Sequence, residues 1–237
     1  MNSKGKYIGL NQRIPFEVLD EAIHTYFSKG EISKAELLAR FLEYTSGINR
    51  AQKGSRSVNL IITRQDPVLQ KLKRSLKTVP YESLRLDERK AISLCLIALT
   101  FPIIYDILVA LSQGLKVQNQ INKKFINEKI KSIYGSNRSV DIAIDALIPM
   151  VIELNAIKRD KVSLYSFGRK LLISNKLVSE LAVYTEIKLS GSKSILMDDL
   201  THRPWFSYFD LSSLDIGHSS QLISRKDSNV GKGYLSI

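Results

Sequence analysis

Residues 121–173 decide the fold, and they read INKKFINEKIKSIYGSNRSVDIAIDALIPMVIELNAIKRDKVSLYSFGRKLLI. Asn122 is placed to cap a helix over residues 123–134, and Gly135-Ser136-Asn137 is a break that ends it. The apolar residues of this helix repeat at helical spacing: Ile126, Ile130 and Ile133. Lys124 and Lys131 fall outside that face and are candidate nucleic-acid contacts. The first part of the stretch therefore predicts one amphipathic helix and a turn.

The second part predicts a longer helix followed by a basic hairpin. Ser139 is placed to cap the helix, whose apolar stripe consists of Val140, Ile144, Leu147, Val151 and Leu154. Residues 162–165 alternate as a strand does, Gly168-Arg169-Lys170 resembles a turn, and residues 171–173 would return as the second strand. Helix, turn, longer helix and hairpin follow one another in the order of a winged helix. The sequence therefore predicts a mainly α protein, a helical bundle with a winged-helix-like unit (helix-turn-helix plus β-hairpin).

The same pattern also fits a helical hairpin and a β-hairpin that pack for stability alone. Opposite the apolar stripe lie Asp141, Asp145 and Glu153, which phosphate would repel, and Pro149 bends the helix there. We therefore do not expect this helix to lie fully inserted in a DNA groove. Asn137 and Arg138 at its N-terminus remain candidate contacts. The candidate cations of the hairpin are Lys158, Arg159, Lys161, Arg169 and Lys170.

The composition indicates a basic globular protein with a polyanionic partner. The chain has 237 residues, 44% of them hydrophobic, and its 35 Lys and Arg exceed its 23 Asp and Glu, which gives a net charge of +12. Nucleic acid is the commonest partner of so basic a chain. The single cysteine, Cys95, lies in an apolar run and excludes a disulfide scaffold, as in a reducing cytoplasm.

Most of the excess charge lies between residues 50 and 77. One acid, Asp66, stands there against eight cations, which gives +7. The cations are Arg50, Lys53, Arg56, Arg64, Lys71, Lys73, Arg74 and Lys77. We expect Gly54-Ser55 to be a loop between helices, and Val68, Leu72 and Leu76 to face inward so that the cations face out. A solvated helix face is the alternative, but such a face normally interleaves acids with its cations.

Three regions are expected along the chain: a helical region with the basic segment (1–80), a core with the winged-helix-like domain (81–190), and an aromatic plug with a flexible tail (191–237). Residues 1–14 are expected to be a loose arm. Residues 91–111 are apolar enough to be considered as a membrane-spanning helix. Pro102 and Asp106 in the middle of this stretch favour two buried helices instead. The aromatic cluster at residues 205–209 could stack bases, although Pro204 favours a plug over the core edge.

No catalytic or metal-binding pattern is visible, so we expect a non-enzymatic protein without a cofactor. The three histidines, His24, His202 and His218, lie in unrelated contexts, and the chain has neither a glycine-rich phosphate loop nor a nucleophile elbow. Asp198 and His202 are four residues apart, but two ligands bind a metal weakly, so a local hydrogen bond is the better interpretation.

The order of these parts over residues 32–172 resembles the BrxA family, accessory proteins of bacterial bacteriophage-exclusion (BREX) systems, which are small and helical and bind DNA. A helix followed by a basic segment resembles residues 31–76, and an apolar helix pair with an internal proline and aspartate resembles residues 94–106. The resemblance implies binding of double-stranded DNA and contacts with other defence proteins.

We therefore expect a phosphate-dominated DNA-binding protein. Two rival functions remain open at this point. One is a sequence-specific transcriptional or plasmid-replication regulator that reads bases with Asn137 and Arg138. The other is an adaptor whose basic surface docks an acidic protein partner.

Overall fold

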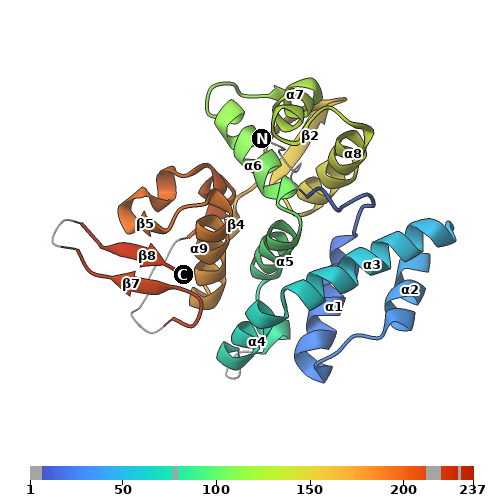
Figure 1. Ribbon diagram of the computed structural model, residues 1–237, viewed down its shortest axis with the longest axis horizontal. Coiled ribbons are helices and arrows are strands. Elements are labelled where there is room, and N and C mark those ends of the chain that lie inside the picture. Colours follow the sequence, from blue (N-terminus) through green and yellow to red (C-terminus); the bar gives the residue numbers. More distant parts are fainter. Residues whose placement is uncertain (1–6, 77–79, 212–219, 229–230) are drawn as a thin grey trace, which may run out of the picture.

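The computed structural model describes residues 7–76, 80–211, 220–228 and 231–237, and these form a mainly helical protein around helix α5 (Leu86–Thr100). From Ala91 onward α5 carries apolar residues on every side, and most of its residues are buried. Such a helix has to be covered all round. Helices α1 (Phe16–Lys29) and α3 (Ile48–Arg64) lie on one side of α5, and α9 (Lys176–Ser190) lies on the other (Figure 1). The prediction of a mainly α fold is confirmed.

The N-terminal helices follow local sequence signals except at Gly54. α1 ends at Gly30, whose φ of 85° is left-handed, and α2 (Lys34–Leu42) begins at Ser33, whose side chain accepts the Glu36 N–H at 3.4 Å. The expected loop at Gly54-Ser55 is wrong, because α3 continues through it. Gly54 allows a close helix contact, since a Cβ there would lie 2.3 Å from Cε1 of Phe41 on α2. α4 (Asp66–Ser75) follows, and then the short 3-10 helix η1 (Tyr81–Ser83).

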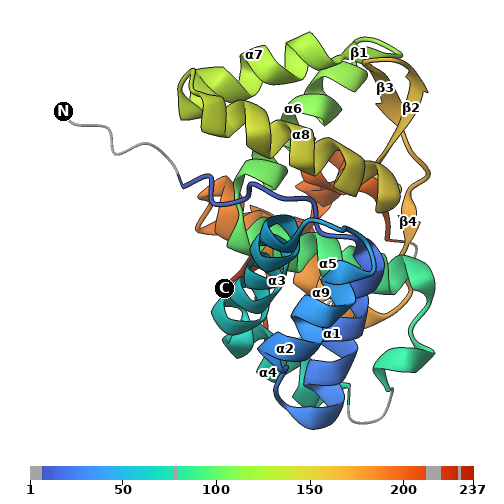
Figure 2. The ribbon, with the colours of Figure 1, turned by 90° about the vertical axis from the view of Figure 1, so that its right-hand side faces the viewer.

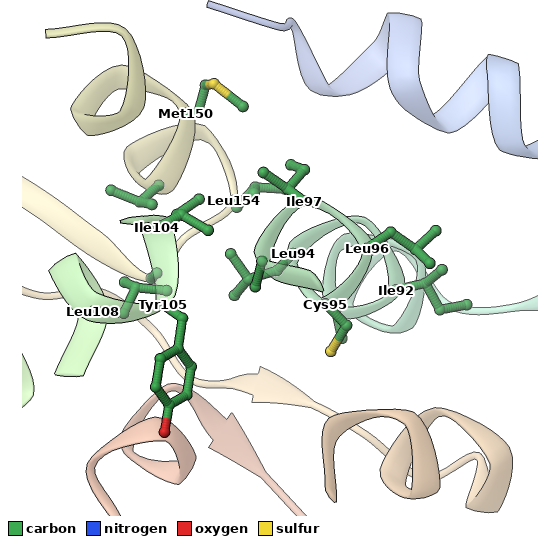
Figure 3. Packing of buried hydrophobic residues seen from close by; sticks show 14 of the residues in the cluster. Ile92, Leu94, Cys95, Leu96, Ile97, Ile104, Tyr105, Leu108, Met150 and Leu154 are labelled. Atoms are coloured by element: carbon green, nitrogen blue, oxygen red, sulfur yellow. The ribbon is translucent and has the colours of Figure 1, made fainter. Parts of the chain in front are cut away.

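The middle of the chain forms a second group of elements, which follows α5. In chain order they are α6 (Ile103–Leu115), β1 (Ile121–Asn122), α7 (Lys123–Tyr134), α8 (Arg138–Glu153), β2 (Ile157–Lys161) and β3 (Leu164–Phe167). The strands form an antiparallel sheet in the order β1-β3-β2, with Ile121 opposite Tyr165. The apolar face of α8 packs on α5 and α6, where Met150 and Leu154 lie near Ile97 and Ile104 (Figure 3). The stripe predicted for this helix is buried throughout.

Several local predictions for this group need correction. The cap of α8 is Asn137, whose side chain accepts the Val140 N–H at 3.1 Å, and Ser139 lies inside the helix. Ile133 is 42% exposed, and Tyr134 takes the inward position instead, where its hydroxyl donates to Asp106 at 2.7 Å. The hairpin consists of β2 and β3, so its tip is Val162-Ser163 and not Gly168-Arg169-Lys170.

The C-terminal part completes the fold with short sheets. Strand β4 (Leu171–Leu172) pairs in parallel with β6 (Phe209–Asp210), and β8 (Tyr234–Ser236) lies between β5 (Ser194–Leu196) and β7 (Ser224–Lys226). The expected flexible tail is therefore wrong for the described residues, because Leu222, Ile223 and Leu235 are buried. The 3-10 helices η2 (Met197–His202) and η3 (Pro204–Tyr208) join β5 to β6.

The aromatic cluster of η3 and β6 belongs to the core. Trp205 is fully buried, its indole Nε1–H donates to the Ala182 carbonyl at 3.1 Å, and the Tyr208 hydroxyl donates to the Leu108 carbonyl at 2.6 Å. Aromatic side chains that are buried with their polar atoms satisfied fill a core edge, as the plug interpretation requires.

The N-terminal segment is packed where it is described, so a loose arm is wrong for residues 7–14. This segment runs between α3 and α8 (Figure 2). Leu10 and Ile14 are buried, the Arg13 guanidinium pairs with Glu153 at 2.9 Å, and the Phe16 N–H donates to the same carboxylate at 3.0 Å. Two apolar side chains and an ion pair thus fix the segment to α8.

Among the described residues, no single helix is both long and apolar enough to cross a membrane. Helices α5 and α6 reach that length and hydropathy only as a pair, and their axes are bent by 114°.

Candidate nucleic-acid interface

The basic segment of the sequence becomes the outer surface of α3 and α4. Four of its cations lie on α3, and each is exposed: Arg50, Lys53, Arg56 and Arg64. At 3.6 residues per turn, these positions fall within about one third of the helix circumference. The opposite face carries Ala51, Val58 and Ile62, which are buried against the core. Since the apolar residues face inward, the cations are held outward at successive turns.

Helix α4 extends this surface with three further cations. Lys71 and Arg74 are exposed and Lys73 is half-buried, whereas Val68, Leu69 and Leu72 are buried. Lys77, the eighth predicted contact, lies outside the described residues. The inward direction predicted for the apolar residues of α4 is therefore confirmed where the structure describes them.

The one acid of this segment, Asp66, is bound by helix α1 and forms no ion pair with the described cations. The Asp66 carboxylate accepts a hydrogen bond from the Tyr26 hydroxyl, to which Gln70 Nε2 also donates at 2.6 Å. Burial, and then the bond to Asp66, raise the pKa of Tyr26 to about 12, so that hydroxyl keeps its proton at neutral pH. Asp66 consequently serves the contact between α1 and α4 and is not ion-paired with the described cations of α3 and α4.

The seven described cations of α3 and α4 have no acidic partner within the described residues. The ion pairs formed there use other cations, such as Arg40 with Glu21, Arg89 with Asp20, and Lys131 with Asp141. Arg64 has an aromatic contact instead, since its guanidinium carbon lies 4.7 Å from the ring centroid of Tyr7. We call these seven residues the α3–α4 basic surface: Arg50, Lys53, Arg56, Arg64, Lys71, Lys73 and Arg74.

The cations predicted on α7 are largely engaged with acids of α7 and α8. Lys131 Nζ lies 2.6 Å from Asp141, Lys123 pairs with Asp145, and Lys124 is 3.9 Å from Glu128. The acidic outer face of α8 is thus neutralised by the neighbouring helix. Lys131 is therefore a poor candidate for phosphate, while Lys124, with 83% of its side chain exposed, remains available. The sequence did not indicate that Lys123 forms an ion pair, because only the fold brings it near Asp145.

The N-terminus of α8 is exposed at Asn137, Arg138 and Ser139. The Asn137 side-chain oxygen is used in capping, and Arg138 has no ion-pair or side-chain hydrogen-bond partner among the described residues. Farther along α8, Met150 and Glu153 contact the N-terminal segment, since Ile14 N–H donates to Met150 Sδ at 3.5 Å. Only the first turns of α8 therefore offer a surface to DNA.

The hairpin presents three of its predicted cations on β2. Lys158, Arg159 and Lys161 are exposed there, and the Arg159 guanidinium carbon lies 5.9 Å from the ring centroid of Tyr165. Asp160 is the one acid among them: it lies 3.6 Å from Lys158, and the Ser166 hydroxyl, together with Gln120 and Lys158, lowers its pKa. The tip itself carries Val162, which is 88% exposed.

Arg169 and Lys170 are not part of this hairpin. They lie between β3 and β4, and Arg169 binds Asp87 in the first turn of α5, which removes it from the expected wing tip. Lys170 is exposed. Gly168 is required for a close backbone contact and not for a turn. A Cβ at this position would lie 1.9 Å from the Asn155 carbonyl oxygen, so the chain can pass the end of α8 only if residue 168 has no side chain.

The buried carboxylates act as structural anchors in the described part of the chain. Glu88 accepts from the N–H groups of Ser174 and Asn175 at 3.1 and 2.7 Å, and Glu186 accepts from Tyr105 at 2.8 Å and from Arg203 at 3.0 Å. Asp198 is exposed; its carboxylate accepts the Lys232 N–H at 3.0 Å, where the sequence predicted a local hydrogen bond to His202. Over the described ranges, no three His, Cys, Asp or Glu side chains come together as a metal site.

Comparisons of this chain with protein-family models, with curated proteins and with solved structures returned no match.

Proposed function

We propose that the protein binds double-stranded DNA mainly through the phosphate backbone, with the α3–α4 basic surface as the principal contact. The observation that carries this proposal is that seven cations lie on two consecutive helices without an acidic partner in the described residues. A helix surface that is merely solvated is usually stabilised by acids placed three or four residues from its cations. Such a surface attracts phosphate and releases counterions when it binds.

We further propose that residues 103–167 form a winged-helix-like unit that supplies a second contact. In support, the elements follow in the order α6, β1, α7, α8, β2, β3, and the sheet order is β1-β3-β2. The contacts would be the α8 N-terminus with Arg138 and the β2 cations Lys158, Arg159 and Lys161. Since the rest of α8 is covered or ion-paired, this unit binds phosphate and reads few bases.

The same proposal includes the biological role that the sequence resemblance implies. A non-enzymatic, cytoplasmic DNA-binding component of a bacteriophage-exclusion system would need affinity for DNA without a cofactor. Cys95 is buried, and burial raises its pKa to about 12, so its thiol stays protonated and unreactive.

Salt-dependent binding tests this function. Random and genomic duplexes are titrated over a salt series with the full chain and with Arg50→Gln/Lys53→Gln/Arg56→Gln, which keeps helix propensity nearly constant. Each lost phosphate contact lowers the slope of log affinity against log salt by about 0.9, so three lost contacts lower it by about 2.7.

The matched control removes three exposed cations elsewhere, Lys29, Lys188 and Lys193, by the same change to Gln. It alters the net charge equally, so only a local interface makes the two triple variants differ. An unaltered slope in a folded α3 variant would contradict the proposal. Sequence-selective binding would favour the regulator, and no binding to any duplex would favour the adaptor that docks an acidic protein.

A further inference from the structure

A surface hollow lies at the end of the α3–α4 basic surface, between α1, α4 and η1. Its volume is about 430 Å³, and its lining residues include the apolar or aromatic Phe27, Leu76 and Tyr81 and the cations Lys73 and Arg74. Sites for small ligands commonly measure about 300 to 1,000 Å³ and combine apolar walls with a few polar groups. The hollow therefore has the size and character of a ligand site.

The apolar wall of the hollow is a fixed pair of aromatic rings. The ring centroids of Phe27 and Tyr81 are 5.2 Å apart at 44°. Tyr81 is buried, and its hydroxyl donates to Asp20 at 2.7 Å, which holds the ring in place. Phe27 is half-buried and lines the hollow, so part of its ring surface is available to a ligand. A preorganised aromatic surface favours a flat, aromatic ligand, because no side-chain ordering has to accompany binding.

The charged side of the hollow selects an anion. Lys73 and Arg74 have no acidic partner in the described residues, whereas the acid among the described lining residues, Glu82, is bound by His24. Gln70 adds an amide to the lining, although its nitrogen already donates to Tyr26. A ligand that satisfies this site carries an aromatic ring and negative charge a short distance apart.

We infer that this hollow binds an unpaired nucleotide of DNA, with the base against Phe27 and the neighbouring phosphates at Lys73 and Arg74. The inference rests on the proposed function, since the two cations belong to the surface assigned there to the phosphate backbone. A base inside a duplex has no free face, so the site takes a single-stranded end or gap next to a duplex. Stacking on an aromatic ring tolerates any base, and cations along the backbone supply the remaining affinity.

A comparison of two DNA probes tests the inference. One is a short blunt duplex, and the other is the same duplex with a single-stranded thymidine extension. We expect the full-length protein to bind the extended probe about tenfold more tightly, which corresponds to about 1.4 kcal/mol and lies within the range for one stacked base. Phe27→Leu, which keeps an apolar side chain but removes the ring, should abolish this preference and leave the affinity for the blunt duplex unchanged.

Two further variants make the result specific to the ring of Phe27. Phe27→Tyr retains an aromatic face and should retain the preference. Phe125→Leu removes another partly buried aromatic residue, on α7 and away from the hollow, and should also retain it. Lys73→Gln/Arg74→Gln should weaken the binding of both probes, and of the extended one more strongly.

Equal binding of both probes by the unmodified protein, or a preference that survives Phe27→Leu, would overturn the inference while the proposed function stands. Failure of both probes to bind would instead remove the proposed function, and the inference with it. Binding of an acidic, tyrosine-containing peptide in the hollow with no effect of the thymidine extension would likewise overturn the inference and identify a protein ligand.

Discussion

Arg169 holds both carboxylate oxygens of Asp87: Nη1 donates to Oδ2 at 2.7 Å and Nη2 to Oδ1 at 2.5 Å. The Leu172 N–H donates to the same carboxylate at 3.0 Å. Burial alone would raise the pKa of Asp87, but the bonds from Arg169 and Leu172 outweigh it and hold the pKa below its ordinary value. This contact ties the segment between β3 and β4 to the first turn of α5, so its role is structural.

We predict that Asp87→Asn lowers the free energy of unfolding at neutral pH by about 1 to 2 kcal/mol, the usual value of hydrogen bonds to a charged group that remains partly solvated. Because the folded-state pKa is lowered, the stabilisation is fully present above the unfolded pKa of about 3.9 and is lost as the pH falls through the folded pKa. Denaturant unfolding of both proteins between neutral and strongly acidic pH measures this. The two stability curves should converge in acid, and parallel curves would contradict the assignment.

We predict that Arg169→Gln leaves the salt dependence of DNA binding unchanged, because its guanidinium is committed to Asp87. The change removes one cation, as does Lys170→Gln at the neighbouring exposed position, which serves as the control for net charge. Salt titrations of both variants against one duplex provide the measurement. A slope that falls by about 0.9 for Arg169→Gln alone would place this residue on phosphate after all.

The helices of the middle region could be predicted from the sequence because their signals are local. Asn122 caps α7 within its own first turn, where its side-chain oxygen accepts the Lys124 N–H at 2.8 Å, and the apolar stripe of α8 lies within one helix. The hairpin register could not be predicted in this way. Ile121 pairs with Tyr165 and Leu171 pairs with Phe209, so partners distant in the chain decide which residues form strands.

The candidate site was predictable in composition but not in geometry. The charge excess between residues 50 and 77 is visible in the sequence, and it lies on exposed helix faces where the structure describes it. Whether a cation is free depends on tertiary neighbours: Lys131 and Arg169 are engaged by Asp141 and Asp87, whereas Arg56 is not engaged in the described residues. The hollow beside Phe27 could not be predicted from the sequence for the same reason, because residues of three different elements line it.

We predict that Leu147→Ala destabilises the protein by about 2 to 5 kcal/mol, because Leu147 is fully buried in the stripe of α8 and its loss leaves a cavity. Ile142→Ala on the same helix is the control, since Ile142 is 39% exposed and should cost much less. Denaturant unfolding compares the two. Equal costs would show that the two positions are buried to a similar extent and that the assigned faces of α8 are wrong.

We predict that replacing Lys158, Arg159 and Lys161 together with Ala weakens the binding of random and genomic duplexes to the same degree. These side chains lie on one exposed strand and would meet phosphate, which carries no sequence information. The reduction in salt slope should be smaller than for three free cations, because Lys158 already lies 3.6 Å from Asp160. Binding assays at several salt concentrations measure it, and an unchanged affinity would exclude the hairpin from the interface.

The last prediction concerns Trp205, the single tryptophan of the chain and therefore its only indole fluorophore. Trp205 is fully buried, its ring lies 5.4 Å from that of Tyr105, and its N–H donates to the Ala182 carbonyl. Its emission should therefore be that of a nonpolar environment, with little quenching by iodide and no change when single-stranded DNA is added. Trp205→Phe removes the indole hydrogen bond and part of a fully buried ring, at a cost of about 1 to 3 kcal/mol. DNA affinity measured on the folded variant should stay the same, because the core plug does not contact nucleic acid. Quenching by DNA, or lost affinity with stability retained, would instead make the aromatic cluster a base-stacking surface.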